Sequence, residues 1–136
     1  MRTQRTWKWR SALGVLAAAA LAACESENPL DRNLISASSI PDLFSFSVNG
    51  LDNVTGGDRY YWTVTGTQAV IDMSQAMSSG TAIVQIRDGS GDVRYLEDAA
   101  DAVDTTTVAG TSGLWQVDIV LTKVTGGFSF TAVGTN

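Results

Sequence analysis

From Leu43 to the end of the chain, hydrophobic and polar residues alternate in short runs, which is the pattern of β-strands that bury one face. Glycine-containing turns separate these runs, and no segment shows the 3.6-residue period of an amphipathic helix. The expected strands lie at about 44–48, 60–65, 69–73, 81–87, 93–95, 105–109, 115–122 and 128–132. About eight short strands at this spacing predict an all-β fold, either a sandwich or a barrel of antiparallel strands.

Two tryptophans stand in the most regular of these alternations. Trp62 lies between Tyr60 and Val64, and Trp115 opens a series in which every second residue is apolar up to position 121. We expect both indole rings to point into the core, where each buries a large apolar area. An exposed aromatic platform would instead suit the stacking of a sugar. The alternation leaves only Tyr61 facing outward, so Tyr61 is the one candidate for an aromatic surface contact.

The first 23 residues have the order of a secretory signal peptide. Four arginine and lysine side chains open the chain, and no acidic residue precedes Glu25. The apolar run 12–23 that follows has twelve residues, whereas a helix that spans a bilayer needs about twenty. This order predicts a leader, residues 1–23, that is removed on export.

The leader ends in Leu21-Ala22-Ala23-Cys24, which resembles the lipobox of bacterial lipoproteins. The resemblance implies cleavage before Cys24, a diacylglycerol thioether on its sulfur, and a fatty acyl group such as palmitate on the new amino terminus. Two or more acyl chains hold a protein durably on a membrane. Glu25, rather than Asp, at the second mature position implies the outer membrane of the cell envelope. The alternative is a secreted protein with an incidental cysteine, although an unpaired thiol is unusual in an oxidising compartment.

Residues 24–41 are polar, contain two prolines and show no sustained period, so we expect the lipidated cysteine and a flexible tether. The β-domain then occupies residues 42–136. The expected mature chain, residues 24–136, holds all 14 acidic residues and five basic ones, which gives a formal charge of about −9. This charge argues against nucleic acid as a partner, because nucleic-acid binding needs a basic face.

Histidine is absent from the sequence. A Ser-His-Asp or Cys-His catalytic arrangement is therefore excluded, and the commonest metal ligand is missing. Paired carboxylates could still serve glycoside hydrolysis. The candidates are Asp88 with Asp92, and Asp98 with Asp101 and Asp104 in the acidic run 97–104, all in expected turns of a domain too small to supply an obvious cleft. Scattered surface acids are the simpler interpretation, and we expect no catalytic residue.

Asp88, Ser90 and Asp92 have the alternate oxygen spacing that opens many calcium loops. An EF-hand would need glycine and glutamate where this chain has Val93 and Ala99, so these residues do not form one. A looser calcium site would draw further ligands from the acidic run: Glu97, Asp98 or Asp101. The alternative is a glycine-rich hairpin whose Asp and Ser side chains bind their own backbone. We favour the hairpin and expect no cofactor other than the lipid on Cys24.

Several marks along residues 43–134 resemble, in their order, bacterial pre-peptidase C-terminal domains. They are Tyr60-Tyr61-Trp62, Ala82–Asp88 ahead of Gly89-Ser90-Gly91, Gly113-Leu114-Trp115-Gln116-Val117, and Gly126-Gly127-Phe128-Ser129-Phe130. Those domains are jelly-roll-like β-sandwiches appended to secreted proteins, so the resemblance implies an antiparallel jelly-roll-like β-sandwich here. Members usually accompany a catalytic domain, which these 136 residues do not contain.

Together these features predict a non-enzymatic, membrane-anchored β-sandwich that acts as an interaction or structural module of the cell envelope. Its expected partner, besides the membrane reached through the lipid, is an envelope protein or a surface polysaccharide. The alternative is a small hydrolase or a calcium-dependent sugar-binding domain that uses the acidic loops. Carboxylates that converge in one concave pocket would favour this alternative, and scattered, solvated acids would favour the binding module.

Overall fold

The computed structural model describes residues 35–136, and every regular element in this range is a β-strand. The elements are β1 (Ile35–Ile40), β2 (Leu43–Val64), β3 (Gln68–Arg87), β4 (Val93–Asp98), β5 (Thr105–Thr106) and β6 (Gly113–Thr135). All pairs are antiparallel, in the order β1-β2-β6-β3-β4, and β5 pairs with β3. The predicted all-β, antiparallel, jelly-roll-like sandwich is confirmed. Within the described range, no helix is long and apolar enough to cross a membrane.

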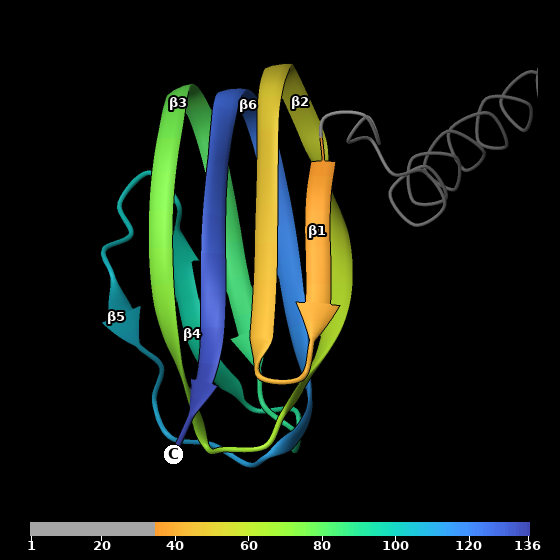
Figure 1. Cartoon of the computed structure of the whole chain (residues 1–136). Coiled ribbons are helices and arrows are strands. Elements are labelled where there is room, and N and C mark those ends of the chain that lie inside the picture. Colours follow the sequence, from red (N-terminus) through yellow and green to blue (C-terminus); the bar gives the residue numbers. More distant parts are fainter. Residues whose placement is uncertain (1–34) are drawn as a thin grey trace, which may run out of the picture.

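The long strands β2, β3 and β6 bend over at one end of the molecule, so that a single sheet folds into two layers (Figure 1). We call the layer that contains β1, β5 and residues 43–48, 68–77 and 128–135 the front layer. The back layer contains β4 and residues 56–64, 81–87 and 113–121. Phe44 of the front layer packs against Trp62 of the back layer, with ring centroids 6.2 Å apart, so the two layers share one core.

The bends replace several of the expected turns. The pairing of β2 with β6 shifts register three times between Val48 and Gly56, and that of β3 with β6 shifts twice between Met77 and Thr81. Gly80 has a φ of 87°, and a Cβ at this position would collide with the carbonyl oxygen of Lys123. The glycines therefore permit a sharp bend without ending the strand. For this reason residues 35–136 form six strands, three of them long, rather than about eight short ones.

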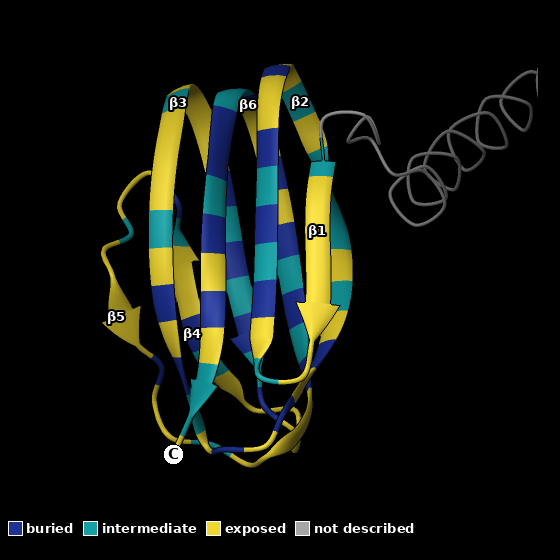
Figure 2. Ribbon diagram, viewed as in Figure 1, coloured by how far each residue is buried: buried dark blue, intermediate teal, exposed yellow. Residues whose placement is uncertain are grey.

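The core lies between the layers and follows the alternation read from the sequence (Figure 2). Trp62 and Trp115 are at most 1% exposed, which confirms that both indoles face inward. Tyr61, between inward-facing neighbours, is 52% exposed, as the alternation predicts. The largest fully buried side chains are those of Trp62, Trp115, Phe44, Phe46, Phe130, Ile71, Ile86, Ile119, Leu121, Val48 and Val64.

Two boundaries differ from the sequence-based expectation. Residues 35–40, which the sequence placed in the tether, pair with β2 as strand β1, so the sheet begins before residue 42. β1 is mostly exposed, and its serine-rich sequence has no buried alternation that would have revealed a strand. The strand expected at 105–109 is reduced to Thr105–Thr106.

Candidate functional site: a hydroxyl-lined groove

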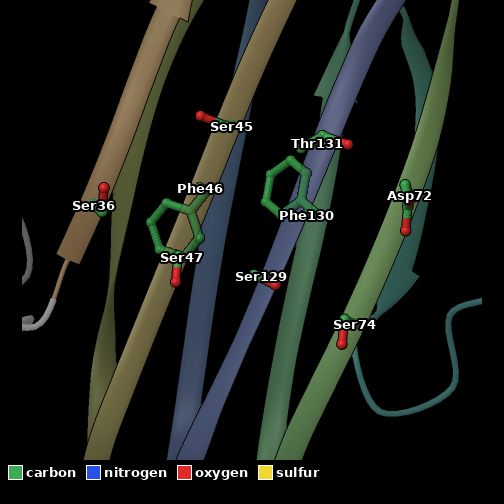
Figure 3. A pocket seen from close by; sticks show the side chains of 9 residues that line it. All are labelled: Ser36, Ser45, Phe46, Ser47, Asp72, Ser74, Ser129, Phe130 and Thr131. Atoms are coloured by element: carbon green, nitrogen blue, oxygen red, sulfur yellow. The ribbon is translucent and has the colours of Figure 1, made fainter.

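An open groove crosses the outer face of the front layer and has a volume of about 350 Å³. This volume lies within the range of about 300–1,000 Å³ that is usual for ligand pockets. Four strands, β1, β2, β6 and β3, supply its lining (Figure 3). The lining residues are Ser36, Ser45, Phe46, Ser47, Asp72, Ser74, Ser129, Phe130 and Thr131.

The polar lining residues form two rows across the strands, because the strands pair in register. Four of them make the serine row: Ser36 pairs with Ser47, Ser47 with Ser129, and Ser129 with Ser74. The second row, which we call the mixed row, lies two residues further along each strand. It contains Ser38, Ser45, Thr131 and Asp72, paired in that order. Ser38 is the one member of these rows that does not line the groove.

The alternation along β2 and β6 explains why polar side chains line the groove while apolar side chains of the same strands point into the core. Phe46 and Phe130 are 1% and 2% exposed, so their rings belong to the core and not to the groove surface. The intervening residues, Ser45 and Ser47 on β2 and Ser129 on β6, face outward. No side-chain hydrogen bond joins the hydroxyls of the groove to another residue in the described range 35–136. Their donors and acceptors therefore remain available to a ligand or to water.

A third row on the same face is apolar, and we call it the apolar ledge. It consists of Ile40, Leu43, Val133 and Val70, which pair in that order on β1, β2, β6 and β3. Each of these side chains is between 38% and 53% exposed. The outer face of the front layer thus carries a hydroxyl-lined groove bordered by an exposed apolar strip.

The groove has little charge. Asp72 is the one ionisable side chain among the residues that line it, and no arginine or lysine is present there. Of the four basic residues in the described range, Arg59 forms an ion pair with Asp118, and Arg94 forms one with Asp88. The other two are Arg87 and Lys123, on β3 and at the bend of β6.

Asp88, a candidate calcium ligand, is buried and holds together the hairpin that follows β3 through its hydrogen bonds. Its Oδ1 accepts hydrogen bonds from the backbone N–H of Ser90 at 2.9 Å, the Ser90 hydroxyl at 2.8 Å and the N–H of Asp92 at 3.0 Å. Its Oδ2 accepts hydrogen bonds from Arg94 Nε at 2.8 Å and the N–H of Thr111 at 2.9 Å. Both oxygens are therefore occupied by this chain.

Burial alone would raise the pKa of the Asp88 carboxyl, because it disfavours the charged form. The hydrogen bonds from Ser90, Thr111, Arg94 and Asp92 outweigh burial and hold that pKa well below its usual range. The carboxylate thus stays ionised at neutral pH and ties the hairpin to the chain around residue 111.

The acidic residues do not converge. No group of three or more potential metal-ligating side chains comes together in residues 35–136. Asp98 accepts hydrogen bonds from the N–H groups of Ala82 and Ala100, and Asp104 accepts one from the N–H of Met73. These carboxylates satisfy backbone groups of the chain itself, and Asp92 stands 68% exposed.

Tyr61 lies on the outer face of the back layer, away from the groove. It pairs in register with Gln116, and the next outward-facing pair along these strands is Thr63 with Leu114. Leu114 is 59% exposed and Val120 is 51% exposed. Arg59, on the same face, is held by Asp118 at 2.6 Å. The structure therefore separates the predicted contact residue Tyr61 from the hydroxyl groove.

The predicted lipidation site Cys24, together with residues 1–34 of the predicted leader and tether, lies outside the described residues. The groove itself was not predicted. Its signal is visible in the sequence, where Ser45, Ser47 and Ser129 alternate with buried phenylalanines. The sequence does not reveal which strands are neighbours, and only the pairing order brings these serines into one row.

No protein-family model and no curated protein matches the chain. Solved structures with similar folds include the carbohydrate-binding module TmCBM61 in complex with beta-1,4-galactotriose, which has 9% sequence identity and a TM-score of 0.43 and covers 74% of this chain and 79% of that one. A family 6 carbohydrate-binding module has 13% identity and a TM-score of 0.40, with coverage of 82% and 91%. PliG of Salmonella Typhimurium, a periplasmic inhibitor of g-type lysozyme, has 15% identity and a TM-score of 0.37, with coverage of 72% and 98%. At these values no function is transferred from any of them.

Proposed function

We propose that this chain is a lipid-anchored, non-catalytic binding module of the cell envelope, and that it holds its ligand in the hydroxyl-lined groove. The observation that carries the proposal is the groove itself, in which four strands present polar side chains that have no partner within residues 35–136. Of the twelve side chains in the three rows, only that of Asp72 is charged. A face that served solubility alone would carry about 25–35% charged residues.

A binding role fits this groove better than hydrolysis does. Glycoside hydrolysis uses two carboxylates on either side of the scissile bond, and Asp72 is the one carboxylate that lines the groove. Asp88, whose pKa is held well below its usual range, has both oxygens engaged by the hairpin and by Arg94. Neither residue is therefore placed to act with a second acid on a bound chain.

The proposed anchor keeps the groove near the membrane. Ser36, at one end of the groove, lies twelve residues after Cys24, and twelve extended residues reach at most about 40 Å. A lipid on Cys24 would hold the groove within that distance of the bilayer surface. The ligand is therefore a component of the envelope close to that membrane.

Photo-crosslinking in living cells tests this proposal. A photoreactive residue replaces Ser38, which belongs to the mixed row but does not line the groove. We expect light-dependent adducts with an envelope component, and fewer adducts when the central pair of the serine row is removed by Ser47→Ala/Ser129→Ala. The proposal fails if position 38 gives no adduct, or if the double variant leaves the adducts unchanged.

A second candidate function, docking of an envelope protein, is favoured by the outer face of the back layer. Tyrosine and arginine dominate the energetics of protein interfaces, and this face carries Tyr61 and Arg59 beside the exposed Leu114. A photoreactive residue in place of Val120 on the same face reports on this surface. Protein adducts at position 120, without adducts at position 38, would support docking and contradict the groove.

A further inference from the structure

We infer that the ligand of the groove is a neutral glycan, an uncharged polyhydroxylated chain that lies across the four strands. This inference rests on the proposed function and names the chemical class of its ligand. It follows from three properties of the outer face of the front layer: its hydroxyl groups, its charge and the apolar ledge.

The hydroxyl groups of the groove match those of a sugar. A serine or threonine hydroxyl can donate one hydrogen bond and accept two, so it pairs with another hydroxyl in either orientation. Five serines and one threonine present this group along the groove, and none of the six is engaged by another residue in the described range. A ligand rich in hydroxyls can satisfy such a surface along its whole length, whereas a peptide backbone alternates fixed donors and acceptors.

The charge of the groove selects against anionic ligands. Phosphate, sulfate and uronate groups are held by arginine and lysine, and the groove lining contains neither. Asp72 instead places a carboxylate at the β3 end of the mixed row, where it would repel an anion and accept hydrogen bonds from neutral hydroxyls. Uncharged sugars satisfy this requirement, and uronates and phosphorylated polymers do not.

The apolar ledge suits the C–H faces of sugar rings, which are apolar. Ile40, Leu43 and Val133 run parallel to the mixed row on the same strands. A ring bound over the mixed row can direct hydroxyl groups into the groove while its C–H groups cover part of the ledge. A protein partner would instead be anchored by Trp, Tyr or Arg, none of which lines the groove.

The arrangement of the rows also gives the direction in which the bound glycan runs. The serine row extends from Ser36 on β1 to Ser74 on β3, three inter-strand spacings of about 4.8 Å, or about 14 Å in total. A glycan that follows the serine row or the parallel mixed row crosses the strands instead of running along them. Its affinity should therefore rise with chain length until the oligosaccharide reaches both ends of the row.

The test is binding by the full chain, solubilised from membranes in mild detergent and measured by calorimetry. The probes are neutral oligosaccharides of two to six residues, derived from glucans, galactans and mannans, together with oligogalacturonates as anionic counterparts. We expect at least one neutral series to bind with affinity that rises with length, and the oligogalacturonates to bind at least tenfold more weakly. Ser47→Ala/Ser129→Ala should weaken neutral binding about fivefold or more, because two hydrogen bonds are lost.

Two further variants make the outcome specific. Thr63→Ala removes an exposed hydroxyl from the outer face of the back layer and should leave binding unchanged. Asp72→Asn removes the carboxylate that would repel an anion, so it should narrow the difference in affinity between the neutral oligosaccharides and the oligogalacturonates. The inference is overturned if no neutral series binds, if uronates bind equally well, or if Thr63→Ala weakens binding as much as the serine pair. If adducts at position 38 still depend on the groove but contain protein, the proposed function stands and the glycan does not.

Discussion

Trp62 on β2 and Trp115 on β6 are register partners, and their rings meet edge to face with centroids 5.6 Å apart and planes at 73°. The pair joins β2 and β6, which are neighbours in the back layer, and Trp62 faces Phe44 of the front layer. The Nε1 of Trp115 donates a hydrogen bond to the carbonyl oxygen of Thr111 at 2.8 Å. The Nε1 of Trp62 is buried without a partner within residues 35–136. The two rings therefore fill the same core, but in residues 35–136 only the indole N–H of Trp115 has a hydrogen-bond partner.

Replacement of either tryptophan by alanine should leave the chain largely unfolded. Loss of a large buried aromatic ring costs about 3–5 kcal/mol, and a small domain has only about 5–15 kcal/mol in total. Tyr61→Ala, on the exposed face, should cost about 1 kcal/mol or less. Chemical unfolding followed by circular dichroism measures all three.

The corresponding phenylalanine variants retain a ring and keep the comparison measurable if the alanine variants do not fold. Trp115→Phe should cost about 1 kcal/mol more than Trp62→Phe, because it also removes the hydrogen bond to Thr111. Unfolding transitions of the tryptophan variants that resemble wild type would contradict the core position of these rings.

Trp62 and Trp115 also illustrate what the sequence could predict. Their inward direction follows from alternation alone, because neighbouring residues on a strand face opposite sides. The groove depends instead on which strands are neighbours, because β6, from the end of the chain, lies between β2 and β3, which are consecutive in the sequence. Similarly, a glycine in the sequence indicates that the chain changes direction, but it does not show whether the strand ends in a turn or continues through a bend. The pairing of β6 with β2 and β3 on both sides of the bend shows that these strands continue.

Asp88 should make the domain sensitive to acid. The folded-state pKa of Asp88 lies below its unfolded value of about 3.9, so its stabilising effect is complete well above that pH. The effect is lost as pH falls below about 4, because the unfolded chain then takes up a proton that the folded chain resists. Unfolding free energies measured between pH 7 and pH 2 should therefore fall steeply below pH 4 in the wild type.

The matched variants for this prediction are Asp88→Asn and Asp92→Asn. Asp88→Asn removes the buried carboxylate that pairs with Arg94 and accepts the hydrogen bonds of the hairpin, and should cost about 3 kcal/mol or more at pH 7. It should also flatten the decline below pH 4. Asp92 is 68% exposed, and its replacement should cost less than about 1 kcal/mol. Equal stability of the two variants would show that the hydrogen bonds of Asp88 do not stabilise the hairpin.

Calcium should have little effect on stability. A calcium ion at the hairpin would have to displace Arg94 and Thr111 from Asp88, and no cluster of further acidic ligands lies nearby in the described range. Thermal melts in millimolar calcium and in chelator should agree within a degree or two. A ligand that binds only the folded state raises its stability by mass action. A rise of many degrees that Asp92→Ala abolishes would therefore reveal a calcium site.

The bend that folds the sheet into two layers should be more sensitive to replacement of Gly80 than the hairpin after β3 is to replacement of Gly91. Gly80 and Gly91 have φ of 87° and 90°, so a side chain is strained by a similar amount at both, about 1–2 kcal/mol. A Cβ at Gly80 also collides with backbone atoms of β6, whereas a Cβ at Gly91 meets nothing within 4 Å. Gly80→Ala should therefore destabilise the domain clearly more than Gly91→Ala. Equal losses in chemical unfolding would show that the bend does not need this close approach.

Cys24 should decide where the protein resides. If Cys24 carries the lipid, Cys24→Ala removes both the thioether and the processing step, and the protein should move from the membrane fraction to a soluble fraction with its leader uncut or miscut. A single acyl chain binds a membrane only marginally, and two or more hold it durably. Metabolic labelling with a clickable fatty acid should therefore mark the wild type and not the variant. Because the groove lies within about 40 Å of the anchor along the chain, the variant should also lose the adducts expected at position 38. Wild-type protein that is unlabelled and soluble would contradict the anchor, and adducts that persist in Cys24→Ala would show that the groove finds its ligand without it.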